Sequence, residues 1–159
     1  MLKKPFNENI LKNLKLKNSF IRSAIWEGLA DKAGFVTKEL INFYKELSQG
    51  GVGTIITGFS NIVEYDKPAS NMIGIYDDKF IPGLKELVDE VHKTDCKIFL
   101  QLVLGGSQGR PGSSKRIVGP SAHTHPVTKQ QAEELTIEEI LELEKKFKLA
   151  GIRAKKAGF

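Results

Sequence analysis

The order of its segments constrains the fold of this chain more than any single motif does. Short apolar runs typical of strands alternate with amphipathic patterns typical of helices, and each kind occurs three times. The strand-like runs cover residues 19–25, 52–58 and 97–103. The order βαβαβα predicts a parallel sheet with right-handed crossovers, either open and doubly wound or part of a closed barrel. A (β/α)8 barrel typically takes about 250 residues. Three units in 159 residues would therefore build only part of one.

The three helical patterns carry their own start signals. The candidate N-caps are Thr37, Asp77 or Asp78, and Thr136. Pro82 suits the first turn of the second helix, and Thr136 with Glu139 has the pattern of a capping box. The predicted buried faces are Leu40, Ile41, Tyr44 and Leu47 in the first helix, Leu84, Leu87, Val88 and Val91 in the second, and Ile140, Leu143, Phe147, Ala150 and Ala154 in the third.

Composition argues against several classes of protein. The net charge is +5, but the basic residues are spread over helical faces without interleaved aromatics, so we expect no nucleic-acid partner. No apolar run approaches the ~18 residues of a membrane span, and residues 5–9, "PFNEN", stand where a signal peptide would have an apolar run. We therefore expect a cytoplasmic protein that binds no membrane. Cys96 is the only cysteine, and His92, His123 and His125 lack metal-ligand spacing. We therefore expect no disulfide and no metal.

The C-terminal ends of the strands are where the sequence predicts a site, because parallel α/β folds gather their chemistry there. Each end carries a polar side chain next to small residues: Ser23, Thr57 and Gln101. Trp26 and Phe59 add flat apolar surface. This combination favours a planar aromatic ligand with hydrogen-bonding edges. For Trp26 the alternative is an ordinary packed core residue.

Gln101 is the most unusual choice in the third strand, where its neighbours are apolar. A buried amide without partners is unfavourable by about 1–3 kcal/mol, so we expect Gln101 to face a polar group. The following residues, 105–129, predict a loop too long for an ordinary connection, and such loops are usually functional or mobile.

Several segments in order resemble the N-terminal part of the Old Yellow Enzyme family, the FMN-dependent NADH:flavin oxidoreductases. The similar segments are "LKN", "GGVGTIITG", "QLVLGGSQGR", "GPSA", "LTIEEI" and "AKKAGF". The resemblance implies an FMN-binding (β/α)8 barrel, of which residues 1–159 would be a single partial domain of about three βα units. Residues 6–20 would form the short hairpin that caps the bottom of the barrel in this family.

The same resemblance implies an activity and a set of flavin contacts. NADH or NADPH would reduce FMN, and the hydride would pass to an enone-like acceptor with an activated C=C bond. The residues that would contact the flavin, by position in the family pattern, are Ser23, Ala24, Ile25, Trp26, Gly58, Phe59 and Gln101. Gln101 would hydrogen-bond the pyrimidine edge of the ring.

Three departures from the family pattern make the acceptor unpredictable. Trp26 stands where many members have a Thr or Cys that hydrogen-bonds the flavin, and Gly28 replaces a tyrosine that contacts substrate in part of the family. Residues 104–107, "LGGS", replace a common "HAGR".

In family members the "AKKAGF" segment leads into a fourth strand that carries the acceptor-binding pair. No catalytic residue is therefore assigned within residues 1–159, and we expect the isolated chain to be inactive. One alternative is a non-catalytic half-barrel that assembles with a separate C-terminal half or with itself. Another is the N-terminal part of a dienoyl-CoA reductase-like or trimethylamine dehydrogenase-like flavoenzyme.

Overall fold

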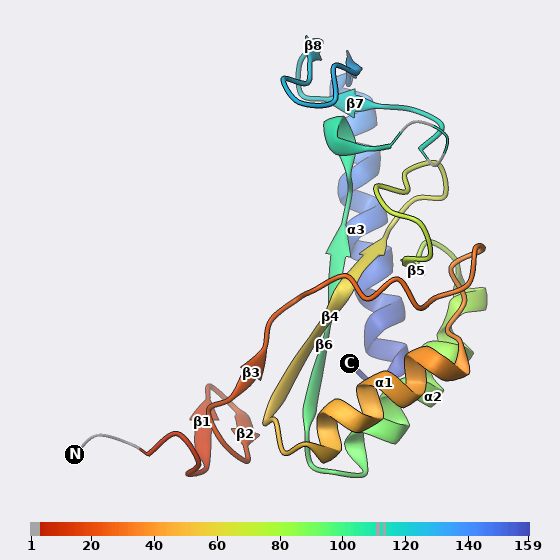
Figure 1. Cartoon of the computed structure of the whole chain (residues 1–159). Coiled ribbons are helices and arrows are strands. Elements are labelled where there is room, and N and C mark those ends of the chain that lie inside the picture. The colour runs from red at the N-terminus through yellow and green to blue at the C-terminus, as the bar shows by residue number, and fades with distance from the viewer. Residues whose placement is uncertain (1–3, 111, 113) are drawn as a thin grey trace.

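A four-stranded parallel sheet forms the centre of the computed structural model, which describes residues 4–110, 112 and 114–159 (Figure 1). Its strands are β3 (Ile21–Arg22), β4 (Thr54–Asn61), β5 (Ile73–Gly74) and β6 (Lys97–Val103). β4 pairs with β6 along one edge and with β3 and β5 along the other, and every pairing is parallel. The predicted parallel α/β architecture is confirmed, and the described strands form no closed barrel.

The strand boundaries agree with the sequence only in part. β6 spans the predicted residues, but β3 is limited to two, because the chain after Arg22 leaves the sheet and crosses in front of β4 (Figure 1). β4 begins two residues later than predicted and ends three residues further on. It extends that far because β5 and β6 both pair with Ser60 and Asn61. The polar residues at the end of β4 are thereby held inside the sheet.

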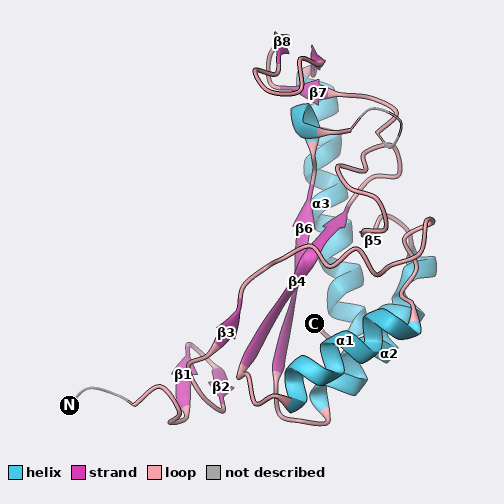
Figure 2. Cartoon of the chain, in the orientation of Figure 1, coloured by secondary structure: helices cyan, strands magenta, loops and turns pink. Residues whose placement is uncertain are grey.

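An antiparallel hairpin precedes the sheet, formed by β1 (Asn9–Leu11) and β2 (Leu14–Leu16). Lys17 and Asn18, which follow β2, connect the hairpin by hydrogen bonds to the loops that precede β6 and β4. The Lys17 ammonium group donates to the Thr94 carbonyl at 2.9 Å, and the Asn18 amide donates to the Gly51 carbonyl at 2.8 Å. The hairpin therefore lies at the N-terminal ends of the strands (Figure 2).

The predicted starts of the first and third helices are confirmed, whereas the second helix begins after Phe80, without a side-chain cap, and not after Asp77 or Asp78. α1 (Lys38–Gln49) is capped by Thr37, whose hydroxyl accepts the Leu40 N–H at 3.1 Å. A 3₁₀ turn, η1 (Asp78–Phe80), capped by Asp77, leads into α2 (Ile81–His92), with Pro82 in its first turn. α3 (Ile137–Ala157) has both halves of the capping box. None of the helices in the described residues is long and apolar enough to cross a membrane.

The core lies between the helices and one face of the sheet, with α3 behind β4 and β6 in the view of Figure 2. The predicted face of α2 is buried throughout, and that of α1 is buried except for the half-buried Leu47. The prediction for α3 is partly wrong: Leu143, Ala150 and Ala154 are buried, but Phe147 is 38% exposed. Leu141, Leu149 and Ile152 are also exposed, which leaves much apolar surface on this helix uncovered by described residues.

A small three-stranded sheet lies above the C-terminal end of β6 (Figure 1). It follows a 3₁₀ turn, η2 (Gly106–Gln108), and contains β7 (Val118–Gly119), β8 (His123–Thr124) and β9 (Gln131–Glu134). β9 lies in the middle, parallel to β7 and antiparallel to β8. The segment predicted as a loop thus contains short ordered elements.

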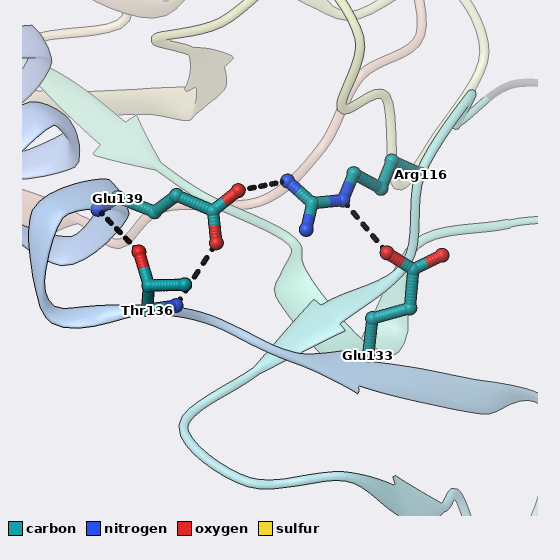
Figure 3. A network of polar contacts seen from close by, with 4 residues as sticks. All are labelled: Arg116, Glu133, Thr136 and Glu139. Atoms are coloured by element: carbon teal, nitrogen blue, oxygen red, sulfur yellow. Dashed lines mark hydrogen bonds and ion pairs between the residues drawn. The ribbon is translucent and has the colours of Figure 1, made fainter.

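Arg116 joins this small sheet to the start of α3 (Figure 3). Its guanidinium group donates to Glu133 on β9 at 2.9 Å and to Glu139 at 2.5 Å. The other oxygen of Glu139 accepts the Thr136 N–H of the capping box at 2.9 Å. One carboxylate therefore both caps the helix and anchors the sheet.

Candidate functional site

Two aromatic side chains and an amide meet at the C-terminal ends of β4 and β6. Phe59 and Gln101 are paired in register across these strands. Trp26, from the segment after β3, lies almost parallel to Phe59, with 10° between the ring planes and 6.3 Å between the centroids. Trp26 is 38% exposed and Gln101 is also exposed. The surface therefore offers a flat apolar platform beside an amide that can donate and accept hydrogen bonds.

The expectation that Gln101 is a buried amide is wrong. Successive side chains of a strand point to opposite faces, and the helices cover only one face of β6. Ile98 on the covered face is buried, whereas Phe99 and Gln101 are exposed. The Gln101 amide therefore needs no internal partner and is available to a ligand.

Thr57 plays a structural part in place of the ligand contact that its position suggested. It is fully buried, its hydroxyl accepts the Gln101 N–H at 3.2 Å, and it donates to the Gly58 carbonyl at 2.8 Å. The register between β4 and β6 shifts between Ile56 and Phe59, as in a β-bulge. Thr57 bridges the two strands at this irregularity and fixes the main chain on either side of the site.

Arg22, which the sequence interpretation did not single out, holds the segment after β3 against β4. Its guanidinium group donates to the Ile56 carbonyl at 2.9 Å and to the Ile25 carbonyl at 3.0 Å. It also lies over the rings of Phe43 and Tyr44 from α1, with 5.5 and 5.7 Å to their centroids. An arginine in a short apolar strand is the signal that could have identified it.

The other predicted residues lie along the same segment and strand. The Ile25 carbonyl is 3.1 Å from where a Cβ on Gly58 would stand, so these two main chains touch. Ser23 is exposed and Ala24 is half-buried, both directly after β3. The structure thus brings Ile25, Trp26, Gly58, Phe59 and Gln101 together. Ser23 and Ala24 lie at the start of the segment that carries Trp26.

Gly28 allows Trp26 to take its position. The φ angle of Gly28 is +69°, a conformation that strongly favours glycine. A Cβ added there would stand 3.2 Å from the indole ring of Trp26. The residue that departs from the tyrosine of the family pattern is therefore required by the local structure.

Glu27 is a second residue that the sequence interpretation missed. Its side chain reaches Gly58, where its Oε2 atom would collide with any Cβ. Oε2 is buried and has no hydrogen-bond partner among the described residues. Burial raises the pKa of Glu27, and hydrogen bonding from the main chain and Tyr44 and the charge of Arg22 offset this only in part.

The end of β4 also holds polar atoms that lack partners. Ser60 and Asn61 are fully buried, and neither the Ser60 hydroxyl nor the Asn61 side-chain oxygen has a hydrogen bond within the described part of the chain. Buried polar groups are usually satisfied, so this end of the strand is suited to a polar ligand or water. In the same residues no group of three or more His, Cys, Asp and Glu side chains could hold a metal ion.

Asp66 fixes the segment that follows β6. Its buried carboxylate accepts the N–H groups of Gly105 and Gly106 and the hydroxyl of Ser114. Burial raises the pKa of Asp66, and these three hydrogen bonds lower it in part. Where the family pattern has a histidine and an arginine, this chain has Leu104 and Ser107, and the two glycines between them let the main chain approach a buried carboxylate.

Comparison with known proteins shows both a family and a fold. A model of the NADH:flavin oxidoreductase / NADH oxidase family matches residues 4–159. The chain is 36% identical over 159 residues to an NADH oxidase of Thermoanaerobacter brockii, covering 97% of this chain and 24% of that protein. It is 35% identical over 156 residues to an NADPH dehydrogenase of Clostridium acetobutylicum, covering 98% of this chain and 46% of that protein.

Solved structures show the same fold at lower identity. An Old Yellow Enzyme homologue from Zymomonas mobilis superposes with a TM-score of 0.89 at 23% identity, over 99% of this chain and 46% of the other. Morphinone reductase in complex with tetrahydroNAD gives 0.87 at 24% identity, over 99% and 48%. The chain therefore spans a quarter to a half of the length of these proteins.

Proposed function

The chain belongs to the NADH:flavin oxidoreductase / NADH oxidase family, and from this membership we propose that the surface of Trp26, Phe59 and Gln101 binds the ring of FMN. The observation that carries the proposal is the register of Phe59 with Gln101, together with the nearly parallel rings of Trp26 and Phe59. A flavin ring is planar and apolar on its faces and has a hydrogen-bonding edge. The residues present fit such a group.

Each residue has a distinct part in this proposal. The segment of Ser23, Ala24, Ile25 and Trp26 runs along the ring, Gly58 and Phe59 lie beside it, and the Gln101 amide meets its polar edge. The Ser60 hydroxyl and the Asn61 side-chain oxygen lack partners in the described residues, but both residues are fully buried and take no part in the proposed contacts with the ring.

We infer that the complete site performs an Old Yellow Enzyme type of reaction, in which NADH or NADPH is oxidised and an acceptor with an activated C=C bond is reduced. When bound, FMN would supply the hydride chemistry. The part of this chain is to orient the ring, cover one side of it with apolar groups and present an amide to its polar edge. Enone-like small molecules remain the proposed acceptors, and the relatives named above leave the choice between NADH and NADPH open.

We propose that further polypeptide completes the site, because the chain spans only 24–46% of its curated relatives. The open sheet supports this. Among the described residues no strand pairs with the outer edge of β3 or β6, and Phe99 on β6 is exposed. The groups that hold the flavin phosphate and the acceptor would then come from that polypeptide.

A second candidate function is a non-catalytic half-barrel that assembles with a complementing half or with a second copy. A groove of about 830 Å³ beside β3 favours it, because its walls are largely apolar. Its lining includes Phe6, Phe20, Ile21, Phe43, Leu47 and Val52. Three of these side chains, Phe6, Phe20 and Ile21, are between 42 and 77% exposed, as expected of a surface that another element covers.

Titration of the purified chain with FMN and with riboflavin, followed by quenching of flavin fluorescence, tests the proposal. We expect saturable quenching by both, since the ring makes the proposed contacts, and weaker binding in Gln101→Ala and Phe59→Ala. Size-exclusion chromatography with light scattering measures the oligomeric state and so tests the second candidate function. Assembly without any flavin binding would favour the half-barrel over the flavin site.

A further inference from the structure

Glu27 is half-buried, with its Oε2 atom fully buried, and the proposed flavin contacts do not use it. It follows Trp26 directly, and Gly58, which it touches, directly precedes Phe59. The contact of Glu27 with Gly58 therefore adjoins the stack of Trp26 on Phe59, one residue further along each segment. Single peptide units therefore join the two pairs.

The surroundings of Glu27 come from three elements. β3 contributes the Arg22 guanidinium group, α1 contributes the Tyr44 hydroxyl, and β4 contributes only the main chain of Gly58. The fully buried Tyr44 hydroxyl accepts the Gly58 N–H at 2.9 Å. Burial and the negative charge of Glu27 raise the pKa of Tyr44 well above its usual range, so Tyr44 keeps its proton and Glu27 is the member that titrates.

The ionised and neutral forms of Glu27 suit this position differently. Oε2 has no hydrogen bond within the described residues, and the hydrogen bonding from the main chain and Tyr44 offsets the burial of the carboxylate only in part. A buried charge that is incompletely compensated is more unfavourable than a neutral group. Arg22 lowers the pKa of Glu27 through its charge, while two of its guanidinium N–H groups donate to the Ile25 and Ile56 carbonyls. The close fit against Gly58 therefore favours the neutral carboxyl, and ionisation favours movement of Glu27 toward solvent.

We propose that Glu27 is a positioning residue of the flavin-ring site, whose protonation holds Trp26 stacked on Phe59 and whose ionisation loosens that stack. The stack itself is a property of this chain, whereas its meaning for flavin binding rests on the proposed function. In the neutral form Glu27 seals the space beside Gly58. In the charged form it draws the segment that carries Trp26 away from β4.

The test uses the intrinsic fluorescence of the full chain, because Trp26 is its only tryptophan. Emission is followed from about pH 4 to about pH 8 without flavin, over the range in which far-UV circular dichroism stays constant. We expect a red shift as pH rises, with a midpoint above the usual glutamate range. In Glu27→Gln we expect the shift to be lost and the emission to match that of the wild-type chain in acid.

Two further measurements keep the outcome decisive. Glu64→Gln, at an exposed position just beyond β4, should retain the wild-type transition. At about pH 8, acrylamide should quench Trp26 less in Glu27→Gln than in the wild-type chain. An unchanged transition in Glu27→Gln, or equal quenching of the two chains, would overturn the proposal. Titration of both chains with FMN tests the proposed function separately. If the Glu27→Gln substitution changed the Trp26 fluorescence but neither chain bound FMN, the proposed function would be contradicted and the proposed role of Glu27 would not.

Discussion

The Glu27 carboxylate occupies the space in which a side chain on Gly58 would begin. Oε2 lies so close to the Gly58 Cα that an added Cβ would overlap it, and the Ile25 carbonyl closes the same space from 3.1 Å. The glycine at position 58 in β4 and the carboxylate of Glu27 after β3 therefore depend on each other. It explains why a glycine, usually unfavourable in a strand, stands at the edge of the site.

Gly58→Ala should destabilise the chain by about 1–3 kcal/mol, because the Ile25 carbonyl, a main-chain group 3.1 Å from the added Cβ, must give way in addition to the Glu27 carboxylate. Denaturant unfolding followed by circular dichroism measures this. Adding Glu27→Ala to Gly58→Ala should recover part of the loss. Gly151→Ala is the matched control, since its Cβ would meet nothing within 4 Å on α3 and should stabilise the helix by up to about 1 kcal/mol. If Gly58→Ala were as stable as the wild-type chain, the described packing would be wrong.

Gly28→Ala should both strain the main chain and displace the indole ring of Trp26. The positive φ alone is unfavourable by about 1–2 kcal/mol for a residue with a side chain. Gly51→Ala measures this main-chain strain alone, because Gly51 has a φ of +93° and open space around it. Both variants should lose stability, but only Gly28→Ala should alter Trp26 emission. Equal emission spectra in the two variants would contradict the contact between Gly28 and Trp26.

The helices and β6 could be predicted because their signals are local. Thr37 and Thr136 cap helices through side chains within three residues, and the apolar spacing of α2 matches a face that is buried throughout. Exposure was harder to predict. Gln101 was expected inside the protein, but its exposure depends on which face of β6 the helices cover, and that is a property of the whole sheet.

The partnership of Glu27 with Gly58 could not be predicted from sequence. The two residues are far apart along the chain, and neither forms a recognisable motif. Their contact depends on how the segment after β3 crosses β4, which no local propensity determines. The same holds for Asp66, whose main-chain partners follow a different strand.

Asp66→Ala should release the segment after β6, because the N–H groups of Gly105 and Gly106 lose their acceptor. Leaving buried donors unpaired is unfavourable by about 1–3 kcal/mol. Amide hydrogen exchange at Gly105 and Gly106 should become faster. Asp66→Asn keeps one acceptor oxygen and should have a smaller effect. Unchanged exchange in Asp66→Ala would show that other groups hold this segment.

Glu139 should contribute a stability that is lost in acid. A hydrogen bond from Arg116 is the main cause that lowers the pKa of Glu139, followed by the capping bond from Thr136. Because the folded protein binds this proton less tightly than the unfolded chain, the contribution is present at neutral pH. It disappears as pH falls through the usual glutamate range to the lowered value.

Thermal unfolding at several pH values measures the contribution of Glu139. Glu139→Gln should flatten the pH dependence while keeping the capping box, since glutamine also serves there. Glu138→Gln removes a charge from the same helical turn and is the control. A pH dependence that Glu139→Gln leaves unchanged would rule out the ion pair with Arg116 as its source.

The most direct test of the flavin-ring site is a ¹H–¹⁵N NMR titration of the labelled chain with FMN. The account predicts that the side-chain amide of Gln101, the indole N–H of Trp26 and the main-chain amide of Phe59 show the largest shifts and saturate together. Saturable shifts confined to the groove beside β3, or no saturable shift at these three groups, would contradict it.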